Sequence, residues 1–289
     1  MRERRLSTSD DPVTEFSNLN DFEASPTIPS GRIAIGFKGI PVDFLFEDRG
    51  YTTTVIAFHG AVMTTVNLPY HIGSGVLTDV PANRISISDP SLTLGGALKL
   101  GWFAGSEDQL GLQEFLGAVV AKIADTSNTD NLVFFGASGG GFSALELSRR
   151  FPSSLAVAIN PQTSISKYWK PAVDLYVEVA WRGKNPFVPN STQLVHDLVE
   201  TYPEYPNNTV AYIQNRRDTH HVKDHYRPFM DKTKNSGRVW ELLGSWGNVG
   251  TTGHTPPPKD ITAMILNQVA SSNGKWDIGL NQAGFAKAT

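Results

Sequence analysis

One stretch, residues 131–145, constrains the fold more than any other part of the chain. It reads NLVFFGASGGGFSAL. Its first residues are apolar and rich in aromatic and β-branched side chains, which is typical of a buried strand in a parallel sheet. A glycine-rich corner follows, and then apolar residues continue at helical spacing until Pro152. The sequence therefore predicts a strand, a sharp turn and a helix in direct succession.

The corner of this stretch carries the pattern Gly136-x-Ser138-x-Gly140. A serine on a sharp turn from strand to helix has a strained backbone, and its neighbours must lack side chains for the turn to close. Such a turn lifts the serine Oγ clear of the sheet, at the positive end of the helix. We therefore predict that Ser138 is a nucleophile.

Two other interpretations of this corner are open. The spacing Gly139-x-Gly141-x-x-Ala144 also matches a dinucleotide-binding fingerprint. That fingerprint normally follows the first strand of a domain and has an acidic residue at the end of the next strand, whereas the next predicted strand here, 155–159, ends at Asn160-Pro161. The other interpretation is a tight structural turn with an unreactive serine. The context of strand, turn and helix favours the nucleophile.

Composition narrows the class of protein. With 289 residues, 40% of them hydrophobic, the chain can build one large α/β core, or a core with a small cap. The net charge of −3 predicts no nucleic-acid partner and no binding to an anionic membrane surface. The chain has no cysteine, so disulfides, thiolate metal sites and cysteine nucleophiles are excluded. Neither a signal peptide nor a transmembrane stretch is evident, and we expect a soluble, cytoplasmic protein.

The hydrophobic patterns predict one domain after a polar start. Residues 1–30 predict a poorly ordered, flexible arm, residues 31–289 form the domain, and residues 161 to about 206 are less regular and predict a cap insertion. Strands are expected at 31–37, 41–47, 53–58, 84–88, 131–135, 155–159, 209–214 and 238–243, the first two as an antiparallel edge hairpin and the last as the final strand. Helices are expected at 108–123, 142–151, 222–234 and 258–270.

Strands that alternate with helices predict a mostly parallel sheet flanked by helices on both faces. The chemistry of such sheets lies at the carboxyl ends of the strands. Ser138, Asp218 and His254 each come shortly after a predicted strand, as do Asp89 and Asn160. We therefore expect these residues at one edge of the sheet.

A serine needs a base, and the base needs an acid that orients it. His254 is the predicted base, because Gly253 before it and the run of prolines after it indicate a rigid, exposed turn. Asp218 is the predicted acid, because it lies four residues past the strand end at Gln214. Asp224 is the alternative acid, although it falls within a predicted helix, where a solvated carboxylate is the simpler interpretation.

An oxyanion hole needs two backbone N–H groups aimed at one point. We predict Gly139, directly after the nucleophile, and Ala61, after the turn His59-Gly60. His59 is a candidate substrate contact, although a structural role that ties down its loop is favoured. The aromatic candidates for a substrate pocket, each equally compatible with ordinary core packing, are Trp102, Phe103, Tyr168 and Trp169.

A metal site also deserves consideration at the predicted helix near residue 222. His221 and His225 are four residues apart, with Asp224 beside them, so a zinc site can be drawn. The motif HExxH is absent from the sequence, and a polar helix start near the acid loop is favoured. We expect neither a metal nor another cofactor.

Together these residues resemble the α/β-hydrolase superfamily over about residues 31–272, since serine, aspartate and histidine follow in that superfamily's order. Four further segments resemble bacterial hydrolase-fold proteins of polysaccharide or glycoprotein assembly, including the accessory Sec protein linked to glycan O-acetylation: Asp89-Pro-Ser-Leu, Gly101-Trp-Phe-Ala-Gly, Asn160-Pro-Gln-Thr and Gln214-Asn-x-x-Asp218-x-x-His221. The resemblance implies the α/β-hydrolase fold with a small cap insertion, a Ser-His-Asp triad and no metal.

Three functions fit these expectations. The first is a serine hydrolase of the esterase type, which cleaves a carboxylic ester of a small molecule or glycan through an acyl-serine. The second is an O-acyltransferase that delivers the same acyl group to a hydroxyl of a glycan or polysaccharide. The third is a non-catalytic scaffold for glycan assembly. The presence of all three triad residue types in order favours an enzyme, and the esterase is the first expectation.

Overall fold

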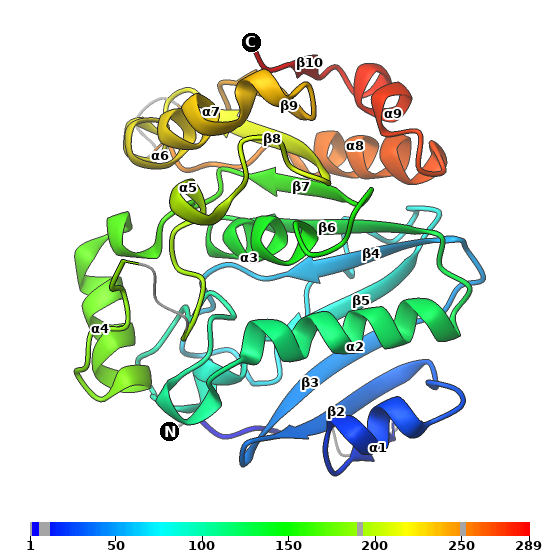
Figure 1. Cartoon of the computed structure of the whole chain (residues 1–289), viewed down its shortest axis with the longest axis vertical. Coiled ribbons are helices and arrows are strands. Elements are labelled where there is room, and N and C mark those ends of the chain that lie inside the picture. The colour runs from blue at the N-terminus through cyan, green and yellow to red at the C-terminus, as the bar shows by residue number, and fades with distance from the viewer. Residues whose placement is uncertain (1, 6–11, 190–192, 249–252) are drawn as a thin grey trace.

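A ten-stranded sheet forms the centre of the described part of the protein (Figure 1). The structure, a computed structural model, describes residues 2–5, 12–189, 193–248 and 253–289. In order across the sheet the strands are β1 (Val13–Phe16), β2 (Gly31–Phe37), β3 (Ile40–Glu47), β5 (Asn83–Ser88), β4 (Thr53–Phe58), β6 (Asn131–Ala137), β7 (Leu155–Ile159), β8 (Thr209–Asn215), β9 (Val239–Gly244) and β10 (Ala286–Lys287).

The six strands β5, β4, β6, β7, β8 and β9 are mutually parallel and carry the centre of the sheet. β3 pairs antiparallel with both β2 and β5, as expected for the predicted hairpin. At the far edge, β10 runs antiparallel to β9. The prediction of a mostly parallel sheet flanked by helices is confirmed, whereas the predicted final strand, β9, is followed by β10.

Both faces of the sheet are buried, and successive residues of each central strand alternate between two cores. In β4, Ile56 and Phe58 join the core under α1 (Leu19–Ala24), α2 (Leu112–Thr126) and α3 (Gly139–Ser148), whereas Val55 and Ala57 face the opposite side. That opposite core is closed by α8 (Lys259–Ser271) and α9 (Trp276–Gln282). A strand buried on both faces must be apolar throughout, which explains the near-continuous hydrophobic runs in the sequence.

The start of the chain differs from the prediction. Residues 12–30, expected to be a poorly ordered arm, include β1, which pairs in parallel with β2, and α1, whose Phe22 is fully buried. Arg4 donates two hydrogen bonds to Asp43 of β3, at 2.7 and 2.6 Å. Polar composition is therefore misleading here, because a few apolar residues and one ion pair attach the segment to the sheet. Residues 1 and 6–11 of the predicted arm lie outside the described residues.

Helix α2 begins later than predicted. Gly111 has a left-handed backbone, with φ 82°, and separates α2 from a short 3-10 turn at Glu107–Gln109. An L-residue rarely adopts that φ, so the glycine fixes where the helix starts. The predicted helix at 222–234 is divided into a π-helical turn, Val222–Tyr226, and α7 (Arg227–Thr233), with Pro228 in the first turn of α7, where a missing N–H is tolerated.

The segment between β7 and β8 contains α4 (Lys170–Trp181) and α5 (Leu198–Thr201), within the range predicted as a cap. Figure 1 shows α4 beside the sheet, on the side toward which the parallel strands point. The hydroxyl of Tyr176 donates to the carbonyl of Gly105 at 2.7 Å and so ties α4 to the body of the protein. Among the described residues, no helix has the length and apolar character needed to cross a bilayer.

Candidate active site

Ser138 stands on the predicted turn, between β6 and α3. Its backbone has φ 56° and ψ −120°, a conformation that a non-glycine residue rarely adopts. The Ser138 N–H donates to the carbonyl of Ile159 at 2.9 Å, which anchors the turn to the end of the neighbouring strand β7. Strain of this kind persists only where the surroundings enforce it, and it is concentrated at functional sites.

The glycines around Ser138 allow two chain segments to approach each other closely. A Cβ atom on Gly136 would lie 2.2 Å from the carbonyl oxygen of Gly140. A Cβ atom on Gly140 would in turn lie 2.2 Å from the carbonyl oxygen of Phe58, at the end of β4. Neither distance is sterically possible, so the turn requires glycine at both positions and the sequence pattern has a direct structural cause.

The three residues predicted as a triad come together. His254 Nε2 lies 3.0 Å from Ser138 Oγ, and His254 Nδ1 lies 2.6 Å from Asp218 Oδ2. The Asp218 side chain is 6% exposed and that of His254 is 33% exposed. A serine hydroxyl bonded to one imidazole nitrogen, with a buried carboxylate on the other, is the arrangement in which histidine can take up the serine proton.

Loop contacts place His254 against Asp218. A Cβ atom on Gly253 would lie 2.0 Å from the carbonyl of Arg217, so only glycine lets the two loops meet. Two asparagine side chains then fix the chain just after the histidine: Asn160 and Asn215 both donate to the carbonyl of Thr255, at 3.2 and 2.9 Å. The histidine loop is thus held by the residues that end β7 and β8.

Asp218 is held in its ionised form. Its burial raises the pKa, but the hydrogen bonds from His221 and His254 outweigh that effect and hold the pKa well below its usual range. Its second oxygen, Oδ1, accepts from the backbone N–H of His221 at 3.2 Å, which caps the short helix α6 (Thr219–His221). An ionised carboxylate at this position can stabilise the positive charge that the histidine ring gains when it takes up the serine proton.

His221 is a second histidine on the same carboxylate. Its Nδ1 lies 3.0 Å from Asp218 Oδ2, and its ring stacks on His254 with centroids 4.1 Å apart at 25°. The residue is 3% exposed, and burial lowers the pKa of its ring. The sequence suggested His221 as a possible metal ligand and as part of the segment Gln214-Asn-x-x-Asp218-x-x-His221, and the structure stacks its ring on His254, the predicted base.

The alternatives that the sequence left open, Asp224 as the acid and a zinc site at His221, Asp224 and His225, are not assembled in the structure. The carboxylate of Asp224 lies 3.0 Å from His220 Nδ1 on a half-exposed surface rather than near His254. His225 is fully buried, and its Nδ1 accepts the Thr163 N–H at 3.2 Å. Within the described residues, the group that has metal-ligand spacing is Asp218, His221 and His254, whose ligand atoms lie within 4.8 Å of one another. That group overlaps the triad itself.

Gln162 is a contact of the serine that the sequence analysis missed as a site residue. Its Nε2 donates to Ser138 Oγ at 3.0 Å, and its Oε1 accepts a hydrogen bond from the indole of Trp102. It follows β7 by three residues, so it lies at the carboxyl edge of the sheet like the triad residues. Its place just after a predicted strand is the one signal in the sequence that could have pointed to it.

Of the two predicted oxyanion donors, Gly139 directly follows Ser138 and Ala61 belongs to a loop that passes close to it. Gly139 is the first residue of α3, where a backbone N–H has no intrahelical acceptor. Ala61 follows Gly60, and a Cβ atom on Gly60 would lie 3.6 Å from Ser138 Cβ, which shows how close this loop passes to the serine. The two predicted donors therefore belong to different segments, α3 and the loop after β4, and their convergence on one oxygen stays a prediction.

Three of the predicted substrate contacts are buried in the protein. His59 is 2% exposed, and Trp102 and Phe103 are each 1% exposed. The two nitrogens of His59 contact Gly60 O at 2.8 Å and the Asp89 N–H at 3.1 Å, and burial lowers its pKa to about 4, so the ring is neutral and ties two loops together. Burial gives all three residues a structural role, as the sequence analysis favoured for His59, and their contact with a substrate stays a prediction. Tyr168 is half-buried and Trp169 is 62% exposed.

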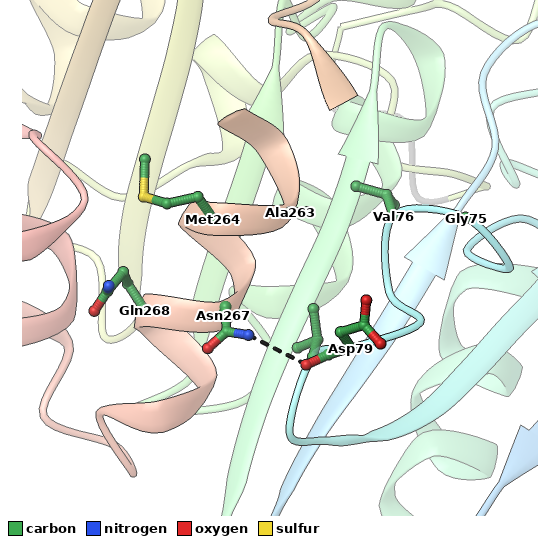
Figure 2. A pocket seen from close by; sticks show the side chains of 8 residues that line it. Gly75, Val76, Asp79, Ala263, Met264, Asn267 and Gln268 are labelled. Carbon is green, nitrogen blue, oxygen red and sulfur yellow. Dashed lines mark hydrogen bonds between the residues drawn. The ribbon is translucent and has the colours of Figure 1, made fainter. Parts of the chain in front are cut away.

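Two pockets are candidates for the place where a substrate binds. One, of about 360 Å³, is lined by Ala61, residues 97–100, Tyr168 and Trp169 just before α4, and residues in the first half of α4. Another, of about 240 Å³, lies between the loop at residues 75–80 and α8, where Asn267 donates to the carbonyl of Asp79 at 3.2 Å (Figure 2). The residues that line this second pocket do not belong to the triad, and α8 covers the sheet face opposite α3. The described lining residues of the first pocket include no triad residue either, but they include Ala61, a predicted oxyanion donor, so we place the first pocket beside the candidate site.

The sheet, the strained serine turn and the chain order of serine, aspartate and histidine define an α/β-hydrolase fold, which comparison with solved structures confirms. The chain is similar to the capsule O-acetyltransferase of Neisseria meningitidis serogroup A, with a TM-score of 0.58 and 14% identity over 83% of this chain and 96% of that chain. It is also similar to the acylaminoacyl peptidase of Pyrococcus horikoshii, with a TM-score of 0.59 and 14% identity over 87% of this chain and 42% of that chain.

A third similar structure is prolyl oligopeptidase B from Galerina marginata, with a TM-score of 0.54 and 15% identity over 89% of this chain and 37% of that chain. No family model matches the sequence, and no curated protein matches it. Identities of 14 and 15% show a shared fold and do not by themselves show a shared reaction.

Proposed function

We propose that the protein is a serine-dependent enzyme that cleaves a carboxylic ester through an acyl-serine intermediate on Ser138. The observation that carries the proposal is the continuous chain of contacts from Ser138 Oγ through both nitrogens of His254 to Asp218, at 3.0 and 2.6 Å. A scaffold that only binds glycan needs neither this series of contacts between serine, histidine and aspartate nor the strained serine turn.

The first half of the reaction forms the acyl-enzyme. Ser138 Oγ attacks the carbonyl carbon of the ester, and its proton passes to His254 Nε2. The backbone N–H groups of Ala61 and Gly139 bind the oxygen that becomes negative, and Asp218 stabilises the imidazolium. The carbon–oxygen bond to the alcohol then breaks, and His254 returns the proton to the leaving oxygen.

The second half removes the acyl group. A hydroxyl compound enters where the alcohol left, gives its proton to His254, and attacks the acyl carbon, and Ser138 Oγ recovers that proton as it leaves. If the hydroxyl compound is water, the enzyme is an esterase. If it is a sugar hydroxyl, the enzyme is an O-acyltransferase, a second candidate that is supported by a fold likeness spanning 96% of the capsule O-acetyltransferase.

One experiment tests the proposal. The folded protein is treated with a fluorophosphonate probe, and the labelled peptide is identified, with Ser138→Ala as the control. We expect label on Ser138 in the wild type and none in the variant. A folded wild type that stays unlabelled and cleaves no short-chain ester would favour the scaffold instead. Following free acid and acylated sugar together, with and without sugar acceptors, separates the esterase from the transferase.

A further inference from the structure

The pocket beside the candidate active site is built from two separate segments. The segment 97–100 contributes Leu98 and Leu100, and the start of α4 with the residues before it contributes Tyr168, Trp169, Ala172 and Leu175. Together they enclose about 360 Å³. We call this space the acyl pocket.

The wall of the acyl pocket reaches both proposed oxyanion donors. Ala61 lines the pocket itself. The neighbouring Val62 N–H donates to the carbonyl of Lys99 at 2.7 Å, which joins the oxyanion loop to the pocket wall. On the other side, a Cβ atom on Gly139 would lie 2.5 Å from Cδ1 of Leu100. The pocket wall therefore includes one proposed oxyanion donor, Ala61, and a side chain, Leu100, that packs against the other.

The chemistry of the walls selects what can enter. Leucine, alanine, proline and tryptophan side chains dominate, and Lys99 supplies the one charged side chain among the described lining residues. Sugar hydroxyls would lose their hydrogen bonds to water against such walls, which costs free energy, whereas a chain of methylene groups gains by leaving water. The hydroxyl of Tyr168 and the indole N–H of Trp169 add two polar groups, and the ring of Tyr168 lies 6.0 Å from that of His221, which places it on the side that faces the triad.

We infer that the acyl pocket holds an unbranched acyl chain of several carbons, so that the enzyme prefers medium-chain acyl esters to acetyl esters. This inference rests on the proposed function and names the acyl half of its substrate. The volume of the pocket is at the small end of the range for ligand sites, about 300–1,000 Å³, so the preference ends once the chain fills it.

The expected gain follows from burial of the chain. Each methylene group that enters the pocket should raise kcat/KM about fourfold, the factor that corresponds to about 0.8 kcal/mol. We therefore expect kcat/KM for p-nitrophenyl esters to rise steadily from acetate through butyrate to octanoate. Beyond the length that fills the pocket, the gain per methylene should vanish.

Two pocket variants and one matched control test this. Ala172→Phe fills the pocket and should abolish most of the preference for octanoate over acetate, whereas Leu175→Ala enlarges it and should move the preference toward longer chains. Ala263→Phe makes the same substitution at a half-buried helical alanine in the pocket of Figure 2 and should leave the ratio unchanged. Binding of octanoate, measured by calorimetry on the same four proteins, reports on the pocket without turnover.

The outcomes separate the inference from the proposed function. Cleavage of acetate at Ser138 with no gain from longer chains would overturn the inference and leave the proposed function standing. A ratio that shifts equally in Ala172→Phe and Ala263→Phe would also overturn it. If no ester is cleaved and Ser138 is not labelled, the proposed function fails. In that case, octanoate binding that Ala172→Phe weakens and Ala263→Phe does not would still support a chain-binding pocket, and no such difference would refute it.

Discussion

The identity of the acid can be decided by one substitution, Asp218→Asn. In the wild type, His254 Nδ1 lies 2.6 Å from Asp218 Oδ2, so the carboxylate holds the tautomer in which Nε2 is free to accept the Ser138 proton. An asparagine that turns its amide N–H₂ toward Nδ1 reverses that tautomer and adds no negative charge beside the imidazolium. We expect kcat for a short-chain ester to fall about 10⁴-fold, which corresponds to about 5.4 kcal/mol of transition-state stabilisation.

The fold should survive this change. Asp218 Oδ1 accepts from the His221 N–H at 3.2 Å, and asparagine can supply the same acceptor at a helix N-cap. Fluorophosphonate labelling should therefore slow in parallel with kcat while the melting curve remains cooperative. These two readouts distinguish a chemical defect from an unfolded protein.

Asp224→Asn is the matched control. Its carboxylate is about one-third exposed and lies 3.0 Å from His220, a surface pair of the kind that contributes little. We expect its kcat to stay within about tenfold of the wild type. The reasoning is refuted if Asp218→Asn keeps kcat within tenfold, or if Asp224→Asn is the crippled variant.

Three further predictions concern the same site. His221→Phe keeps a ring against His254 but removes the Nδ1 atom that lies 3.0 Å from Asp218 Oδ2. Steady-state kinetics should show a lower kcat, and an unchanged kcat would contradict this role. Activity should survive treatment with EDTA. Added Zn²⁺ should inhibit the enzyme by binding to Asp218, His221 and His254, whereas activation in a Zn²⁺ titration would argue for metal catalysis. Burial lowers the pKa of His59 and of His71 to about 4, whereas a histidine in the unfolded chain has a pKa of about 6.5. Between these pH values the unfolded chain therefore binds more protons than the folded protein, and acid favours unfolding. Tm measured by calorimetry should fall as the pH drops from 7.5 to 5, and a constant Tm would refute the argument.

Local sequence was enough to predict the nucleophile turn and the sheet around it. The stretch 131–145 combines a buried strand, glycines that permit a close turn, and a helix, and each of these depends on neighbouring residues alone. The central strands were equally readable, because a strand buried on both faces must be apolar along its length. Since parallel strands end at one edge, chain position also predicted which polar residues would meet, and Ser138, Asp218 and His254 do meet.

The details of the site depended on contacts between residues far apart in the sequence. Ser138 and His254 are 116 residues apart, and Gln162 reaches Ser138 only because β7 lies next to β6. The choice of Asp218 over Asp224 depends on the direction of one loop after β8, where Gly253 lets the histidine loop approach Arg217. No local pattern specifies such an approach.

Burial is the other property that sequence alone left open. His59 and Trp102 are residue types that often contact substrates, yet both are buried under the surrounding loops. Their side chains hydrogen-bond to those loops and hold them in place. Residues 12–30 have the composition of a disordered arm, yet β1 finds a partner in β2, and the buried Phe22 anchors α1. The type of a side chain indicates whether it prefers water or the protein interior. Whether it is buried depends on which segments fold over it, and only the tertiary structure determines that.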